Sequence, residues 1–274
     1  MELDVNELFF WEPIAFAGTP FEINRVVILM FVASIACMAF FLIGARTTLV
    51  PKGLHNLAET AYLFVRDRIA IDVIGPGEGL KFAPYLAAVF YFIFFANLLE
   101  IVPGINFPVT SRMAIPVALA VLTYIIFNAV GIMRQGPIQY FKAILFPPGV
   151  PWPIYFLLTP IEFFSTFIIR PLTLSIRLLA NMIAGHVLLT IFFLFSAEFV
   201  SLDLVVLPLG LVSALVAAVL ILFELLVIGI QAYIFTTLTA FYISEAIHGH
   251  GEETEGPAEH RETRHETEGV ASAA

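Results

Sequence analysis

Charged residues and cysteine are both scarce in this chain of 274 residues. Asp, Glu, Lys and Arg make up 13% of the sequence and hydrophobic residues 60%, whereas an ordinary soluble domain has about 25% charged residues. This composition indicates a membrane protein. The single cysteine, Cys37, excludes an internal disulfide, and we interpret it as a packing residue within an apolar run. No Cys/His cluster suggests a metal, and we expect no cofactor.

Several functional motifs are also absent from the sequence. It has no nucleotide-binding motif and no nucleophile–base arrangement, so we expect the chain not to be an enzyme on its own. We expect no nucleic-acid partner. Five acidic residues precede the first basic residue, Arg25. That order is the reverse of a signal-peptide n-region, so no cleaved leader is predicted.

Long apolar runs dominate what the sequence does contain, and five of them reach the roughly 20 residues that a helix needs to cross a bilayer. The predicted spans are residues 26–45, 82–102, 114–133, 154–197 and 204–245. A helix of about 40 residues is about 60 Å long, roughly twice the hydrocarbon core. The last two runs are therefore either strongly tilted helices or hairpins, and we favour two strongly tilted antiparallel helices. The predicted fold is an all-α membrane protein.

Two segments differ from the spans. Residues 54–69 place His55, Glu59 and Arg66 among apolar residues at near-helical spacing. This pattern predicts an amphipathic helix on the membrane surface or, equally, a small docking helix that faces solvent. Residues 248–274 are acidic and low in complexity, so we predict a disordered tail after a single polytopic membrane domain of residues 1–247.

The distribution of Lys and Arg predicts the orientation in the membrane. An outside N-terminus leaves only Arg25 and Arg112 outside. Nine basic residues then face the cytoplasm: Arg46, Lys52, Arg66, Arg68, Lys81, Arg134, Lys142, Arg261 and Arg264. The positive-inside rule therefore predicts a cytoplasmic C-terminus in the cell membrane.

Arg177 lies deep inside the fourth apolar run, where a charge costs roughly 2.5–3.5 kcal/mol. A guanidinium cannot release its proton to avoid that cost, so Arg177 is a candidate functional residue. Snorkelling or a structural ion pair is the alternative. Asn181 lies four residues later on the same helix face. Arg170, seven residues before Arg177 and followed by Pro171, is interpreted as a lip or headgroup anchor.

The last run carries Glu224 and Gln231 on one stripe. If Gln231 lies level with Arg177 in an antiparallel pair, Glu224 lies near the depth of His186. A histidine beside a carboxylate can accept and release protons, which is typical of intramembrane proton relays. Such a pair can also be purely structural, just as an asparagine in a span can simply bond a neighbouring helix.

Two further acids extend this pattern. Glu100, near Asn97 at the end of the second span, is a candidate for the outer path. Glu162 precedes Arg177 by about 22 Å along the helix and is a candidate for a separate exit. Either carboxylate can alternatively be interfacial.

These residues carry a close family resemblance. The segments PLTLSIRLLANMIAGH (171–186), FELLVIGIQAYIFTTLTAFYI (223–243) and NLLEIVPG (97–104) resemble the a subunit of F-type ATP synthases. The resemblance covers about residues 25–247. The spacing from Glu162 to Pro171 is one residue longer than in many relatives.

The resemblance implies a proton-conducting stator subunit with two offset half-channels, which couples proton flow to rotation and ATP synthesis. It implies that Arg177 faces the c-subunit ring, and that Glu162 and Thr173 lie near the inner half-channel. The outer half-channel residues that it implies are Glu100, Asn181, His186, Glu224 and Gln231. The implied partners are the c-subunit ring, b-type peripheral stalk subunits, the remaining ATP synthase subunits and membrane lipids.

Two other functions remain open from the sequence. A secondary ion- or proton-coupled transporter tends to show two similar halves, and we find no convincing repeat. A structural membrane subunit would leave Arg177, Asn181 and Gln231 unexplained.

Overall fold

The computed structural model describes residues 23–44, 53–102, 105, 107–146, 151–202 and 207–248. The predicted acidic tail after His248 lies outside the described residues, as do the N-terminal acids.

Five long helices are apolar enough to cross a membrane, as the sequence predicts. They are α2 (Arg25–Gly44), α5 (Pro76–Leu98), α6 (Ala114–Gln135), the continuous helix of α8 (Trp152–Phe164), η3 (Ser165–Ile169) and α9 (Arg170–Leu202), and α10 (Leu207–His248). The all-helical membrane fold and the great length of the last two spans are confirmed.

Shorter elements connect these helices. They are α3 (Leu54–Val65), the π-helical turn η1 (Arg66–Ile71), α4 (Asp72–Ile74), the 3₁₀ turn η2 (Val109–Ser111) and α7 (Pro137–Leu145). The predicted surface helix at 54–69 therefore appears as α3 running directly into η1.

The second span begins at Pro76, six residues before its predicted start. The sequence reads as a polar connection there because Glu78 and Lys81 interrupt the apolar run. In the structure Glu78 accepts hydrogen bonds from Lys81 at 2.9 Å and from Arg134 of α6 at 2.5 Å. These pairs satisfy the charges, so the helix continues through them.

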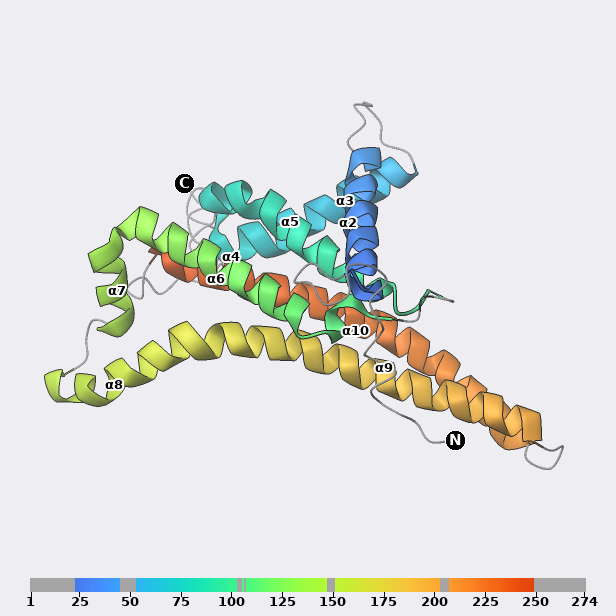
Figure 1. Cartoon of the computed structure of the whole chain (residues 1–274). Coiled ribbons are helices and arrows are strands. Elements are labelled where there is room, and N and C mark those ends of the chain that lie inside the picture. Colours follow the sequence, from blue (N-terminus) through green and yellow to red (C-terminus); the bar gives the residue numbers. More distant parts are fainter. Residues whose placement is uncertain are drawn as a thin grey trace, which may run out of the picture.

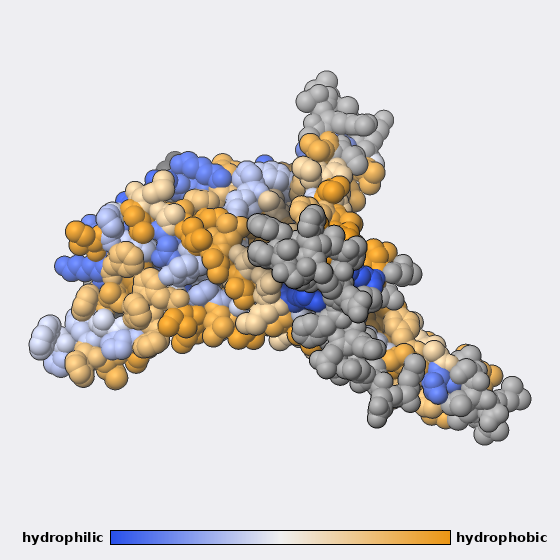
Figure 2. Space-filling model, viewed as in Figure 1, coloured by the Kyte–Doolittle hydropathy of each residue, from blue (hydrophilic) through white to orange (hydrophobic). Residues whose placement is uncertain are grey.

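The last two helices lie side by side and run in opposite directions along the whole length of the molecule (Figure 1). The α5 and α6 helices pack over the half of this pair that contains the end of α10, and α2 stands across it. Hydrophobic residues cover much of the face seen in Figure 2. An apolar surface of this kind suits contact with lipid tails.

The main core lies where α5, α6 and α10 meet, with fully buried side chains such as Leu86, Ile93, Phe235 and Ile243. A smaller cluster of Val26, Leu29, Ala33, Phe107 and Val109 joins α2 to the segment around η2. This second cluster holds the 107–111 segment against α2 and the end of α5.

Three contacts fix the register of α9 against α10. Asn181 meets Gln231, Gly185 meets Glu224, and the Ser213 hydroxyl donates to the Phe192 carbonyl at 2.9 Å. Residue numbers rise along α9 as they fall along α10, so the two helices are antiparallel, as predicted. Gln231 lies opposite Asn181, one turn from the assumed level of Arg177.

Candidate functional site

Arg177 lies on the exposed side of α9, two turns after its first residue. Thr173 and Asn181 are exposed on the same face, whereas Leu174 and Leu178 point into the core. The ion pairs found between described residues do not include Arg177. The Arg177 guanidinium therefore lies on the exposed surface of the α9–α10 pair.

An amide pair bridges the two helices next to Arg177. Asn181 Nδ2 donates to Gln231 Oε1 at 2.5 Å, and Gln231 is buried. Gln231 therefore lies level with Asn181. The prediction assumed that Gln231 lies level with Arg177, which is one turn earlier on α9. Gln231 Nε2 is buried and has no hydrogen-bond partner among the described residues.

A cluster of two carboxylates and an imidazole lies further along the helix pair. His186 Nδ1 is 3.5 Å from Glu100 Oε1, and the His186 ring meets the Phe107 ring edge to face at 5.8 Å between centroids. The Glu224 carboxylate packs against Gly185, the residue just before His186. Both carboxylates and His186 are buried. The structure thus places Glu224 at the depth of His186, but His186 forms an ion pair with Glu100.

The Glu100 carboxyl lies just beyond the end of α5. Burial raises its pKa above the ordinary value, and the neighbouring His186 lowers that pKa by a smaller amount. This group is therefore held protonated to a higher pH than a carboxyl in water.

Polar atoms from the 107–111 segment and the end of α5 complete the cluster. The Thr110 hydroxyl donates to Asn97 Oδ1, and both residues are buried. Asn97 Nδ2, both Glu100 oxygens and Glu224 Oε1 are buried without a hydrogen-bond partner among the described residues. Thr110 was not predicted, because its segment shows no helical periodicity that would place it beside α5.

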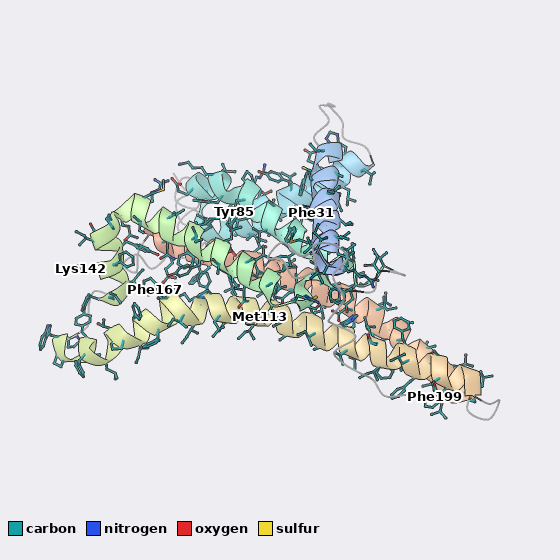
Figure 3. All side chains as sticks on the ribbon, viewed as in Figure 1. Phe31, Tyr85, Met113, Lys142, Phe167 and Phe199 are labelled. Atoms are coloured by element: carbon teal, nitrogen blue, oxygen red, sulfur yellow. The ribbon has the colours of Figure 1, made fainter. Side chains whose placement is uncertain are left out.

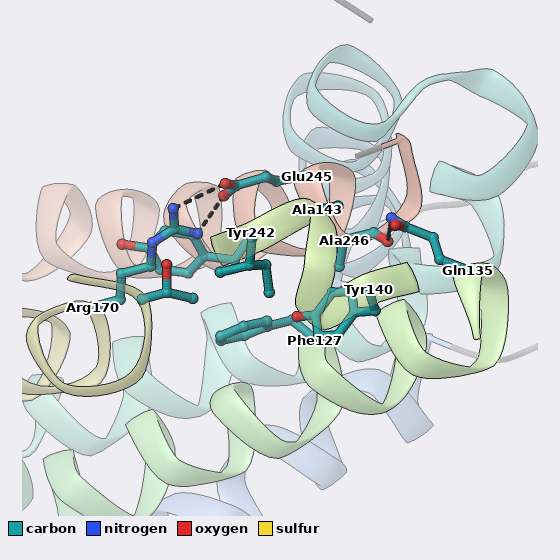
Figure 4. Close-up of a pocket in the computed structure, with 10 residues that line it drawn as sticks. Phe127, Gln135, Tyr140, Ala143, Arg170, Tyr242, Glu245 and Ala246 are labelled. Carbon is teal, nitrogen blue, oxygen red and sulfur yellow. Dashed lines mark hydrogen bonds and ion pairs between the residues drawn. The ribbon is translucent and has the colours of Figure 1, made fainter. Parts of the chain in front are cut away.

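At the opposite, α8 side of Arg177, the first residue of α9 forms an ion pair. The Nη1 and Nη2 nitrogens of Arg170 donate to the Glu245 carboxylate of α10, with Nη2 to Oε1 at 2.9 Å, and the guanidinium carbon lies 5.3 Å from the Tyr242 ring centroid. The pair lines a cavity of about 10 Å³ between α6, α7, α9 and α10 (Figure 4). The sequence analysis interpreted Arg170 as a lip or headgroup anchor and did not predict this pairing with Glu245.

The two remaining candidates lie on either side of the π-helical turn. Glu162 is half-buried on α8, and Thr173 is exposed on α9 with its hydroxyl donating to the Ile169 carbonyl at 2.8 Å. The π turn between them has room for one extra residue relative to a continuous α-helix. It can therefore accommodate the one-residue longer spacing from Glu162 to Pro171 that the family resemblance implies.

The arrangement offers proton-transfer groups without a metal centre. Within the part of the chain that the structure describes, no group of three or more His, Cys, Asp or Glu side chains is placed to hold a metal ion. Carboxylates, an imidazole and amides can pass protons or bind water, and the fixed cation at Arg177 can attract or repel a moving charge.

Comparison with known proteins gives a consistent result. The family model for the ATP synthase A chain matches residues 26–244. Proteins named ATP synthase subunit a are 43% identical in Rhodococcus erythropolis, over 88% of this chain and 88% of the relative, and 45% identical in a Parafrankia species, over 87% and 79%. One from Frankia alni is 42% identical over 96% of this chain and 90% of its own length.

Proposed function

The chain belongs to the ATP synthase A chain family, a membrane-sector subunit of a proton-translocating complex, and from that membership we propose that it is the stator half of the proton path. In this proposal it does not make ATP itself. It supplies two half-channels that open on opposite sides of the membrane and a cation between them.

The outer half-channel runs through the cluster around His186. Protons enter past Glu100 and His186, reach Glu224, and pass the Asn181–Gln231 pair toward the outer face of α9. The buried polar atoms that have no hydrogen-bond partner among the described residues support this path, since leaving one unsatisfied costs about 1–3 kcal/mol and water relieves that cost.

Arg177 separates this path from the inner one. A carboxylate on a partner ring takes up a proton from the outer path and crosses lipid as a neutral group, because a bare carboxylate there is costly. When it arrives from the other side, the Arg177 charge lowers the pKa of that ring carboxyl and releases its proton inward. Glu162 and Thr173, on the α8 side of Arg177, line the exit.

The observation that carries this proposal is the placement of Arg177. It is exposed on an apolar helix pair and outside the ion pairs of the described residues, while an amide pair lies one turn away and the acid and imidazole groups lie further along the same helix pair. A structural arginine would be neutralised within the chain, as Arg170 is.

Substitution of Arg177 tests the proposal directly. We expect Arg177→Ala to abolish ATP-driven proton pumping in inverted vesicles that hold the whole complex, while the complex still assembles. The matched control is Arg66→Ala, which removes an arginine paired with Asp67 outside the spans. Normal pumping by the Arg177→Ala complex would contradict the proposal.

The proposal also gives the orientation of the chain in the membrane and the partners that contact it. The N-terminus lies outside and the C-terminus in the cytoplasm, as the Lys and Arg distribution predicts. The exposed face of α9 and α10 meets the c-subunit ring, and the remaining surface is available to b-type stalk subunits and lipid.

A further inference from the structure

Two arginines lie on one stripe of α9. Arg170 and Arg177 are seven residues apart, which is nearly two full turns, so their Cα atoms lie on nearly the same face and about 10 Å apart along the axis. Both side chains are long enough to extend from that face. If the proposed function holds, a rotor carboxylate that leaves Arg177 on the inner side would pass close to the position of Arg170.

Arg170 and Arg177 differ in exposure and in ion pairing. Arg177 is exposed and lies outside the described ion pairs, whereas the Arg170 guanidinium turns aside to α10 and binds Glu245 through two nitrogens. The exposed fractions of the Arg170 and Glu245 side chains are only 19% and 17%. A bidentate ion pair of this kind has the geometry that best compensates both charges.

Neighbouring groups hold the Glu245 carboxylate in place for this pairing. The Tyr242 ring lies 5.3 Å from the Arg170 guanidinium carbon, and Gln135 Nε2 of α6 donates to the Ala246 carbonyl at 2.9 Å. Figure 4 shows these groups converging from α6, α9 and α10. The end of α10 is therefore fixed with its carboxylate toward Arg170.

We propose that Glu245 masks the charge of Arg170, so that a passing rotor carboxylate meets the uncompensated cation of Arg177 and not that of Arg170. This inference rests on the proposed function. It assigns Glu245 and Arg170 as positioning residues for the encounter at Arg177, with no direct part in proton transfer.

Charge masking predicts different effects for the loss of Glu245 and the loss of Arg170. Glu245→Gln leaves Arg170 as a bare cation, because a guanidinium cannot lose its proton. Arg170→Gln leaves a bare carboxyl, which can become neutral by taking up a proton. A pair that only anchors two helices loses the same contact in either variant and predicts equal damage.

The experiment measures ATP-driven proton pumping by inverted vesicles holding the whole complex, normalised to the amount of assembled complex. We expect Glu245→Gln to slow pumping roughly tenfold and Arg170→Gln much less, since only the first leaves an unneutralisable charge. The double variant Arg170→Gln/Glu245→Gln should regain more than about half of the wild-type rate. The matched control is Glu78→Gln, which breaks the Arg134–Glu78 pair away from the α9 stripe and should leave pumping nearly unchanged.

Several results would overturn the masking role. Equal losses in the two single variants, a double variant as slow as Glu245→Gln, or a fast Glu245→Gln complex would each do so. If Glu245→Gln fails to assemble, an assembled and active double variant supports masking, and a double variant that also fails to assemble overturns it. Normal pumping by Arg177→Ala would instead reject the proposed function, so the two failures are distinguishable.

Discussion

Gly185 leaves the space that the Glu224 carboxylate occupies. A Cβ at this position would fall well inside contact distance of that carboxylate. Because the end of a glutamate side chain is flexible, we expect Gly185→Ala to displace the carboxylate and leave the helix intact. Passive proton conductance of vesicles stripped of the catalytic head should fall to about the level of Glu224→Gln, within roughly twofold.

Gly229→Ala is the control for this prediction, since a Cβ there meets nothing within 4 Å. Wild-type conductance in Gly185→Ala would show that the position of the Glu224 carboxylate does not limit proton entry.

The pairing of Glu100 with His186 predicts a pH effect. His186 lowers the pKa of Glu100, which burial raises, so His186→Gln moves that pKa further up. Glu100 then keeps its proton at pH values where it would otherwise release it. We expect the acidic limb of passive conductance, plotted against pH, to shift to higher pH. His55→Gln, on the surface helix α3, serves as control; an unshifted limb or a shift to lower pH would contradict the relay through Glu100.

Single-residue chemistry was predictable where it depended on one helix. A charge inside an apolar run singled out Arg177 as a candidate, and spacing on the same helix placed Asn181 one turn from it. The level of Gln231 on α10 was assumed, and the structure places it opposite Asn181. The Glu100–His186 contact was not predictable, because it depends on how α5 ends. The Arg170–Glu245 pair was missed since its partners are 75 residues apart and no local pattern links them.

Among the elements, the π turn η3 can accommodate the longer spacing from Glu162 to Pro171 that the family resemblance implies. One extra residue there would rotate α8 by about 100° if the helix stayed regular. The wider turn at Ser165–Ile169 absorbs it. Thr166, within this turn, is buried with its hydroxyl unpartnered among the described residues, and π turns of this kind are frequent at functional sites.

Close packing of α5 on η1 gives a prediction at the same scale. A Cβ on Gly79 would lie 2.8 Å from the Ala70 carbonyl carbon and 3.2 Å from the Ile71 Cα. Backbone atoms cannot yield as a side chain can, so Gly79→Ala should push the two elements apart and cost about 1–3 kcal/mol. A lowered thermal-unfolding midpoint of the complex in mild detergent would show this.

Gly77→Ala is the matched control, because a Cβ on Gly77 meets nothing within 4 Å and alanine favours a helix by about 1 kcal/mol. An unchanged midpoint in Gly79→Ala would mean that the contact between α5 and η1 relaxes without cost.

At the scale of the whole molecule, length and hydropathy were sufficient to predict five spans and two unusually long final helices. The packing of α5 and α6 on α10 could not be predicted, because apolar residues occur on every face of these helices and periodicity does not distinguish a lipid-facing side from a buried one. The antiparallel direction of α9 and α10 was predictable, but their register was assumed, and Gln231 lies one turn from the assumed level.

The direction of the whole path depends on which way the chain is inserted. Met113 and Lys142, both exposed, lie at opposite ends of the α6–α7 segment (Figure 3). Because the chain has one cysteine, Cys37, a Cys37→Ser background allows single cysteines to be placed at these two sites. We expect a membrane-impermeant maleimide to label Met113→Cys in right-side-out vesicles and Lys142→Cys only in inverted ones. Labelling in the reverse order would place the His186 cluster on the cytoplasmic side and exchange the entrance with the exit.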